Sequence, residues 1–200
     1  MISPGYPSEM PIFTQALAAD GARVIGVGDQ PADALPEMAR RSVSRYVQIS
    51  SFADEGAAVD ETLAALRGTN VDLVESMWEA TMYLAARLRE RIGTPGLDVV
   101  HTIPFRDKQV MKEVLGAAGI RVPRSVRAST IDAVRAGADE VGYPLIIKPI
   151  AGAGSMDTYR IDEPAGLDPV LPRSTRSTPS RPAVESSTTT CAGTGPGLWP

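Results

Sequence analysis

Short apolar runs and amphipathic stretches alternate along the first half of the chain. Apolar residues at helical spacing predict helices at residues 9–20, 34–41, 57–67 and 79–91. The apolar runs between them predict strands at residues 22–27, 46–49 and 71–74. Strands that alternate with helices favour an α/β fold around a parallel sheet.

Capping residues mark the predicted helix ends in both halves of the chain. Ser8, Asp107 and Thr130 are expected N-caps, while Gly119 and Gly142 are expected stops. Each helix has an apolar stripe that should be buried. The stripes are Ile12, Phe13, Ala16 and Leu17 in the first helix, Val110, Met111, Val114, Leu115 and Ala118 after Asp107, and Ile131, Val134, Ala138 and Val141 after Thr130.

A lysine ends the strongest apolar run of the second half, residues 145–147. An ammonium at Lys148 is costly beside a buried strand unless it meets an anion. Gly152, Ala153, Gly154 and Ser155 follow, and such small residues let backbone N–H groups approach a ligand. With a return strand at residues 156–161, the segment predicts a hairpin that holds phosphates.

Lys108 is a second candidate for phosphate binding. It follows the expected N-cap Asp107, so it lies in the first helical turn, where the helix dipole opposes a cation. This position favours a bound anion as its partner. A solvated surface lysine is the alternative.

In combination, these motifs resemble the N-terminal lobe of the ATP-grasp fold, found in ATP-dependent carboxylate-amine ligases and biotin carboxylases. The resemblance is carried by RDKQVMKEVLGAAGIRVPRS, a second helix, and VGYPLIIKPIAGAGSMDTYRID. It implies a Rossmann-like domain at residues 1–103 and the first ATP-binding lobe at 104–166. Residues 167–200, which lie beyond the resemblance, are expected to be a low-complexity, disordered tail. The resemblance also implies that Lys108, Lys148 and the loop from Gly152 to Ser155 bind ATP.

The resemblance implies an ATP-dependent ligation through an acyl phosphate, with a small-molecule carboxylate and amine as substrates and Mg²⁺ on the phosphates. In that family a second lobe carries the magnesium ligands, so none is expected in this chain, and no catalytic residue is identified. We therefore expect a truncated fragment that turns over poorly or not at all. The alternative is a non-catalytic nucleotide- or partner-binding protein, which would release no ADP with such substrates.

Two carboxylates of the first half are candidate substrate contacts. Glu75 and Glu79 follow the predicted strand at 71–74, and ligands bind at the carboxyl ends of strands in open α/β sheets. The alternative is that Trp78 packs in the core and Glu79 starts a helix, where a carboxylate suits the dipole.

Other cofactor sites find little support in the chain. Gly26 and Gly28 begin a dinucleotide fingerprint, but Pro31 stands where its third glycine belongs, which argues against a nicotinamide-dependent oxidoreductase. His101 is the sole histidine, and no metal-ligand spacing accompanies it. We expect it to pack or to be half exposed.

The net charge of −4 offers no bulk attraction for nucleic acid or an anionic membrane. A single cysteine, Cys191, suits a reducing compartment. The chain opens without a leader pattern and contains no run of 18 apolar residues. A cytoplasmic protein is expected, and its oligomeric state is not predicted.

The tail differs in composition from the rest. Of its 29 residues from Pro172 onward, 11 are Ser or Thr, so it should bury too little apolar surface to order itself. We hypothesise a frameshifted reading of a longer ligase, which sequencing the gene in all frames would test. A natural disordered tail is the alternative. With half of the nucleotide cleft missing, Leu145, Ile147 or Ile150 should be exposed to water.

Overall fold

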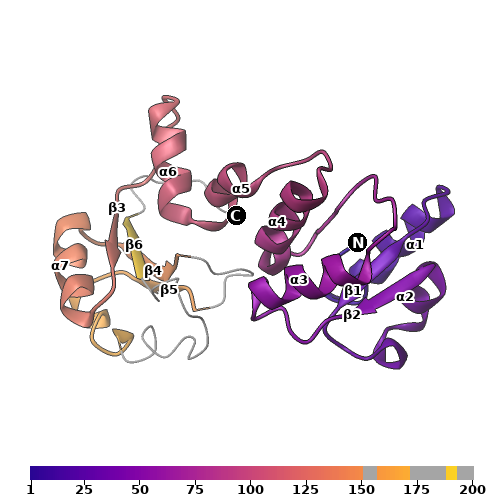
Figure 1. Ribbon diagram of the computed structural model, residues 1–200. Helices are drawn as coiled ribbons and strands as arrows, with labels where there is room; N and C mark the ends of the chain where they lie inside the picture. The colour runs from indigo at the N-terminus through magenta and orange to yellow at the C-terminus, as the bar shows by residue number, and fades with distance from the viewer. Residues whose placement is uncertain (151–156, 172–187, 193–200) are drawn as a thin grey trace. The chain divides into compact units, whose positions relative to one another are not determined.

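The computed structural model describes residues 1–150, 157–171 and, for the backbone alone, 188–192. The chain divides into two compact units, Met1–Thr102 and Ile103–Pro200, which are described separately (Figure 1). The boundary falls within helix α5 (Val99–Arg106). No helix in the described ranges is long and apolar enough to cross a membrane.

The first unit is an α/β layer built on a short parallel sheet. Strands β1 (Ile25–Gly28) and β2 (Arg45–Gln48) pair in parallel, with Val27 opposite Val47. Its helices are α1 (Met10–Ala19), α2 (Glu37–Ser42), α3 (Glu55–Ala65) and α4 (Met82–Ile92), with 3-10 turns η1 (Ala32–Ala34) and η2 (Glu79–Thr81). The alternation predicted from the sequence is confirmed, except at residues 71–74.

Those four residues form no regular strand. Their neighbour Glu75 instead accepts a backbone hydrogen bond from Ile2, 2.8 Å from N to O. On its other side, Ile2 forms an isolated parallel bridge with Val27 of β1. Residues 71–74 have no strand beside them, because the segment that lies between β1 and residues 71–75 consists of only three residues, 1–3.

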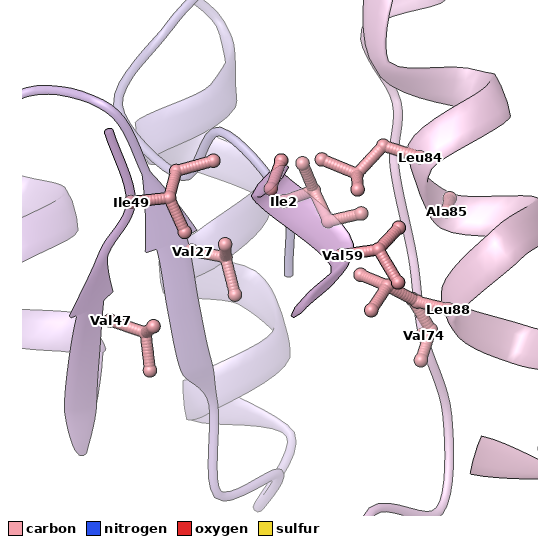
Figure 2. Close-up of a cluster of buried hydrophobic side chains, with 10 residues drawn as sticks. Ile2, Val27, Val47, Ile49, Val59, Val74, Leu84, Ala85 and Leu88 are labelled. Atoms are coloured by element: carbon pink, nitrogen blue, oxygen red, sulfur yellow. The ribbon is translucent and has the colours of Figure 1, made fainter. Parts of the chain in front are cut away.

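The apolar core of the first unit lies between the sheet and two helices. Figure 2 shows Ile2 and Val27 in this cluster, together with Leu84 and Leu88 of α4. Ile2, Leu84 and Leu88 are each at most 2% exposed. Residues from the chain start, β1 and α4 are thereby held in one packed unit.

Helix α1 is rotated from the orientation that the sequence predicts. Met10 and Thr14 face the core, whereas Ile12, Phe13 and Leu17 are exposed. The Thr14 hydroxyl lies 3.1 Å from the Pro4 carbonyl oxygen and 2.9 Å from that of Met10, so its polar group is satisfied inside. The expected buried stripe is therefore wrong. The Ser8 cap is wrong as well, because Ser8 bonds the carboxylate of Glu9, which holds the N-cap position.

The two glycines of β1 make room for a tyrosine. A Cβ added to Gly28 would lie 2.3 Å from the Tyr46 hydroxyl oxygen, which donates a hydrogen bond to the Gln30 carbonyl. A Cβ on Gly26 would lie 3.1 Å from the Tyr46 ring. Close packing, rather than a dinucleotide, accounts for both positions.

The second unit is an antiparallel sheet with helices α6 (Lys108–Ala117) and α7 (Ile131–Val141). Its strands are β3 (Ser125–Ala128), β4 (Leu145–Pro149), β5 (Tyr159–Ile161) and β6 (Thr188–Ala192), in the order β3-β6-β4-β5. The hairpin of β4 and β5 follows the prediction, with Leu145 opposite Ile161. Strand β3 has no counterpart in the sequence analysis.

Strand β6 lies within the segment predicted to lack regular structure. It pairs antiparallel with β3 on one side and with β4 on the other. The structure differs from the prediction because β3 and β4 do not pair with each other, which leaves an edge of each strand open to a third strand. The run of β-branched threonines in β6 suits a strand at this position.

The core of the second unit buries the apolar face of β4. Leu145, Ile147 and Ile150 are each at most 2% exposed, so the expected exposure of this face is wrong. Val134, Ala138 and Val141 of α7 pack with the first two and with Leu167 and Leu171, which follow the 3-10 turn η3 (Pro164–Gly166). Ile131, the first residue of the expected stripe, is instead 39% exposed. This core therefore extends beyond residue 166, the expected end of the lobe.

Candidate functional site

Helix α6 begins as the sequence predicts. The Asp107 carboxylate accepts hydrogen bonds from the backbone N–H groups of Gln109 at 2.8 Å and Val110 at 3.1 Å. Its other oxygen forms an ion pair with Arg127 of β3, 2.7 Å from O to N. The first N–H groups of α6 are thus bound by this carboxylate, so they are not available to an anion.

The start of α6 lies over one face of the sheet. Ser125 donates a hydrogen bond of 3.1 Å to the Gln109 side chain, and Ser125 and Arg127 share a face because side chains alternate along a strand. Val126 and Ala128 point to the opposite face, where they join the core. The face with Ser125 and Arg127 is called the outer face below.

Lys148 lies on this outer face. Leu145 and Ile147 point into the core, so Ile146 and Lys148 alternate to the other side of β4. Lys148 is half-buried, and within the described ranges its ammonium makes no hydrogen bond or ion pair. By contrast, arginines of this unit do have carboxylate partners, such as Arg160 with Asp162.

Lys108 lies at the same end of β4. Its ammonium and its backbone N–H each lie 3.4 Å from the carbonyl oxygen of Ile150, two residues after Lys148. The structure therefore brings the two predicted lysines to the point where the chain enters residues 151–156. Gly152, Ala153, Gly154 and Ser155, the other predicted phosphate contacts, lie outside the described residues.

Two further basic residues near Lys108 were missed in the sequence analysis. Arg106, at the end of α5, is 3% exposed, and Lys112, in α6, is 5% exposed. Lys112 is one turn after Lys108, so both lie on the same face of α6. The spacing of four residues between Lys108 and Lys112 could have shown that they share a helix face. The apolar stripe that includes Val114 instead led to the prediction that a different face of α6 is buried. Val114 is in fact exposed.

The two candidate substrate contacts belong to the first unit. Glu75 is exposed and forms an ion pair with Arg89, 3.3 Å from oxygen to nitrogen. Arg89 also donates to the Val74 carbonyl at 2.8 Å, so it fixes the chain just before Glu75. Glu79 begins the turn η2.

Three aromatic rings of the first unit pack against one another around Trp78. The Trp78 ring meets Tyr6 edge-on at 5.0 Å between centroids and Phe52 at 6.1 Å. Trp78 thus packs against other side chains, as expected if this segment has only a structural role. In the sequence it lies between Glu75 and Glu79. In the described part of the chain, no three His, Cys, Asp or Glu side chains come together as metal ligands would.

The sole histidine is in α5 and is exposed. Its Nδ1 lies 2.7 Å from the Asp98 carboxylate, which also accepts a hydrogen bond from the His101 backbone. These hydrogen bonds lower the pKa of Asp98. The contacts between Asp98 and His101 stabilise the first turn of α5.

Comparison with known proteins matches residues 107–183 to a family described as the carbamoyl-phosphate synthase L chain, ATP binding domain. An alanine–anticapsin ligase of Bacillus subtilis is 30% identical over 109 residues, which are 54% of this chain and 23% of that protein.

Solved structures extend the likeness to nearly the whole chain. An L-amino acid ligase from Bacillus licheniformis aligns with a TM-score of 0.71 at 21% identity, over 92% of this chain and 41% of that one. An N5-carboxyaminoimidazole synthetase from Staphylococcus aureus, complexed with ADP, aligns with a TM-score of 0.71 at 16% identity, over 96% and 46%. The chain therefore spans less than half of each of these proteins.

Proposed function

Because the chain has the fold of the N-terminal portion of an ATP-grasp ligase, we propose that it is the ATP-binding part of an ATP-dependent carboxylate-amine ligase. One observation carries the proposal: Lys148 is half-buried on the outer face of the sheet, and in the described part of the chain its ammonium has no partner. Lys108 lies at the same end of β4 through its contact with Ile150.

The charges of the outer face fit a polyphosphate. An ammonium about 4 Å from a phosphate oxygen contributes roughly 4 kcal/mol at an effective dielectric constant near 20, before desolvation is subtracted. Asp107 binds the first N–H groups of α6, so the helix terminus cannot supply this attraction. We therefore assign phosphate binding to the two lysine side chains and, from the sequence, to the loop from Gly152 to Ser155.

The proposed chemistry follows from holding charge in position. ATP with Mg²⁺ would supply the phosphoryl group that converts a carboxylate into an acyl phosphate with release of ADP, and attack by an amine would then form the carbon–nitrogen bond and release phosphate. In our proposal Lys148 and Lys108 neutralise negative charge and orient the phosphates. Because β4 packs against α7 in the core, the backbone that carries Lys148 is held in a fixed position.

We assign Glu75 and Glu79 as substrate contacts, since a carboxylate is the natural partner for the ammonium of an amine substrate. The Arg89 ion pair would then fix the orientation of Glu75. Residues 1–103 are proposed as the Rossmann-like domain and residues from 104 onward as the first ATP-binding lobe. Since the relatives are more than twice as long, we propose that this chain binds ATP but turns over poorly by itself.

Titration calorimetry with ATP and Mg²⁺ tests the binding site. We expect binding in the micromolar to millimolar range, and a loss of about tenfold or more for Lys148→Ala, as for a hydrogen bond to a charged group. Arg135→Ala is the matched control, because it removes an exposed cation from α7, which covers the other face of the sheet. Undetectable binding to the unchanged chain, or equal losses in both variants, would contradict the proposal.

Release of ADP tests the ligase chemistry separately. The chain is incubated with ATP, Mg²⁺ and pairs of small carboxylates and amines, and ADP is measured over time. Slow release that needs both substrates and disappears in Lys148→Ala supports a ligase. Binding of ATP without any substrate-dependent release would instead indicate a non-catalytic nucleotide-binding protein.

A further inference from the structure

Four backbone segments lie side by side in the first unit and each is followed by a turn. Strand β1 ends at Gly28 and β2 at Gln48, while Ile2 pairs in parallel with Val27 and donates to the Glu75 carbonyl. Turns that follow parallel segments lie at the carboxyl edge of the sheet, where ligands bind in open α/β folds. These four turns carry Tyr6, Asp29, Phe52 and Trp78.

Tyr6, Phe52 and Trp78 are called the aromatic cluster below. The Trp78 ring is nearly perpendicular to both neighbours, at 83° to Tyr6 and 81° to Phe52. Within residues 1–102, all of which are described, the buried core is aliphatic, and neither Tyr6 nor Trp78 belongs to it. Tyr6 is 57% exposed, and the other two residues are half-buried. The cluster therefore presents aromatic surface to solvent instead of filling the core.

Buried hydroxyl groups hold the backbone of two of these residues. The Ser3 hydroxyl donates to the Tyr6 carbonyl at 2.5 Å, and the Thr81 hydroxyl donates to the Trp78 carbonyl at 3.1 Å. Ser3 and Thr81 are each at most 5% exposed. Rings that are fixed in this way lose little freedom when a ligand binds, so the cluster is preorganised as a binding surface.

Carboxylates accompany the cluster at this edge. Asp29 is exposed, and its carboxylate accepts a hydrogen bond of 3.3 Å from the Phe52 N–H. A carboxylate has about four acceptor positions, so Asp29 can accept further hydrogen bonds. Glu75 and Glu79 belong to the turn that carries the tryptophan, and Arg89 offsets one of their charges through its ion pair with Glu75. The negative charge at this edge favours a cationic ligand.

The spacing of the rings suits a cation bound beside them. An ammonium group is attracted to the face of an aromatic ring when it lies within about 6 Å of the centroid. The centroids of Tyr6 and Trp78 are 5.0 Å apart, so one cation can meet this condition for both rings. Methyl or methylene groups on its nitrogen would cover the exposed ring surface.

We propose that the aromatic cluster and Asp29 bind an organic cation, namely an ammonium group that carries methyl or methylene groups. The rings supply cation–π attraction and apolar contact, and Asp29 supplies the opposite charge. Taking this cation to be the amine substrate rests on the ligase function proposed above. The cluster then binds the carbon atoms next to the amine, in addition to the charge assigned to Glu75 and Glu79.

Choline and its neutral analogue 3,3-dimethyl-1-butanol test the proposal, because they share a shape and differ in charge. Each is titrated into the full chain carrying Trp199→Phe, so that Trp78 alone reports by fluorescence. Sodium chloride at equal concentrations controls for ionic strength. We expect choline to bind about fivefold or more tightly than the alcohol, as for a cation–π contact. Equal affinities, or a fluorescence that choline does not change, would overturn the proposal.

Substitutions locate the site. Tyr6→Leu should weaken choline binding about threefold or more, because it keeps an apolar side chain and removes a ring. Phe13→Leu is the matched control, since it removes an exposed ring from α1, outside the cluster. Equal losses in both variants would contradict the site. Thermal melts check that each variant folds. Asp29→Asn removes no ring and should weaken binding of choline but not of the alcohol, and an unchanged choline affinity would contradict the role of Asp29.

Two more readouts separate this site from the ATP site. Butylammonium, a primary amine that is charged at neutral pH, should displace choline, and failure to displace it would contradict the assignment of the cation as the amine substrate. ATP is titrated into the same unchanged chain. ATP binding without choline binding would contradict the cation site alone, whereas choline binding without ATP binding would contradict the proposed function alone.

Discussion

Raising the pH from 6 to 8 should stabilise the first unit against unfolding, because the α-ammonium of Met1 is buried in it. Its pKa falls from 8.0 to about 6 on folding, chiefly through loss of hydration. Between these values the unfolded chain binds more protons than the folded one, so the free energy of unfolding rises with pH. The destabilisation is fully present below pH 6 and disappears above pH 8.

The size of this effect follows from the shift. Two pKa units correspond to about 2.7 kcal/mol at low pH, and integration of the proton uptake leaves about 2 kcal/mol between pH 6 and pH 8. For a unit of this length, about 2 kcal/mol is a large part of the total stability. The change should therefore be visible in a urea midpoint.

Urea unfolding at pH 6, 7 and 8 measures this free energy. The fluorescence of Trp78 reports on the first unit once the other tryptophan is removed by Trp199→Phe. The control is the same chain with an acetylated α-amino group, which carries no titrating charge. An acetylated chain with an unchanged pH dependence would refute the reasoning.

Two substitutions test the packing. Ile147→Ala should cost about 2–5 kcal/mol of unfolding free energy, because Ile147 is fully buried. Ile146→Ala, on the outer face, should cost less. Equal losses in urea titrations would contradict the assigned faces. Gly28→Ala should cost about 1–3 kcal/mol, because its Cβ would overlap the Tyr46 hydroxyl, and Tyr46→Phe should relieve part of the loss in thermal melts. Gly116→Ala is its control, since the nearest contact there is 3.7 Å away, and a loss as large as that of Gly28→Ala would argue against overlap.

Local signals in the sequence were sufficient where a feature depends on neighbours along the chain. The caps at Asp107 and Thr130 and the stop at Gly142 need only a few adjacent residues, and all three are confirmed. The parallel pairing of β1 and β2 followed from the alternation of elements. The position of Lys148 on the outer face follows from the two-residue period of its strand.

Features that depend on distant segments could not be predicted in this way. Helix α1 has two faces with apolar residues, and its contact with Pro4 decides that Thr14 faces inward. The burial of Ile147 depends on α7 and on Leu171, which is 24 positions later. The ion pair of Asp107 with Arg127 joins a cap to a strand of only four residues, too short to show a period.

The order of strands in the second unit has a consequence for the synthesis of this protein. Among the described residues, strand β6 is the last strand along the chain, yet it lies between β3 and β4, which make no ladder with each other. A ribosome therefore releases α6, β3, α7 and the β4–β5 hairpin long before the strand that joins them. Until Thr188–Ala192 emerge, two open sheet edges remain on the nascent chain, and such edges invite pairing with other chains. The emergence of Thr188–Ala192 thus decides when this sheet can close.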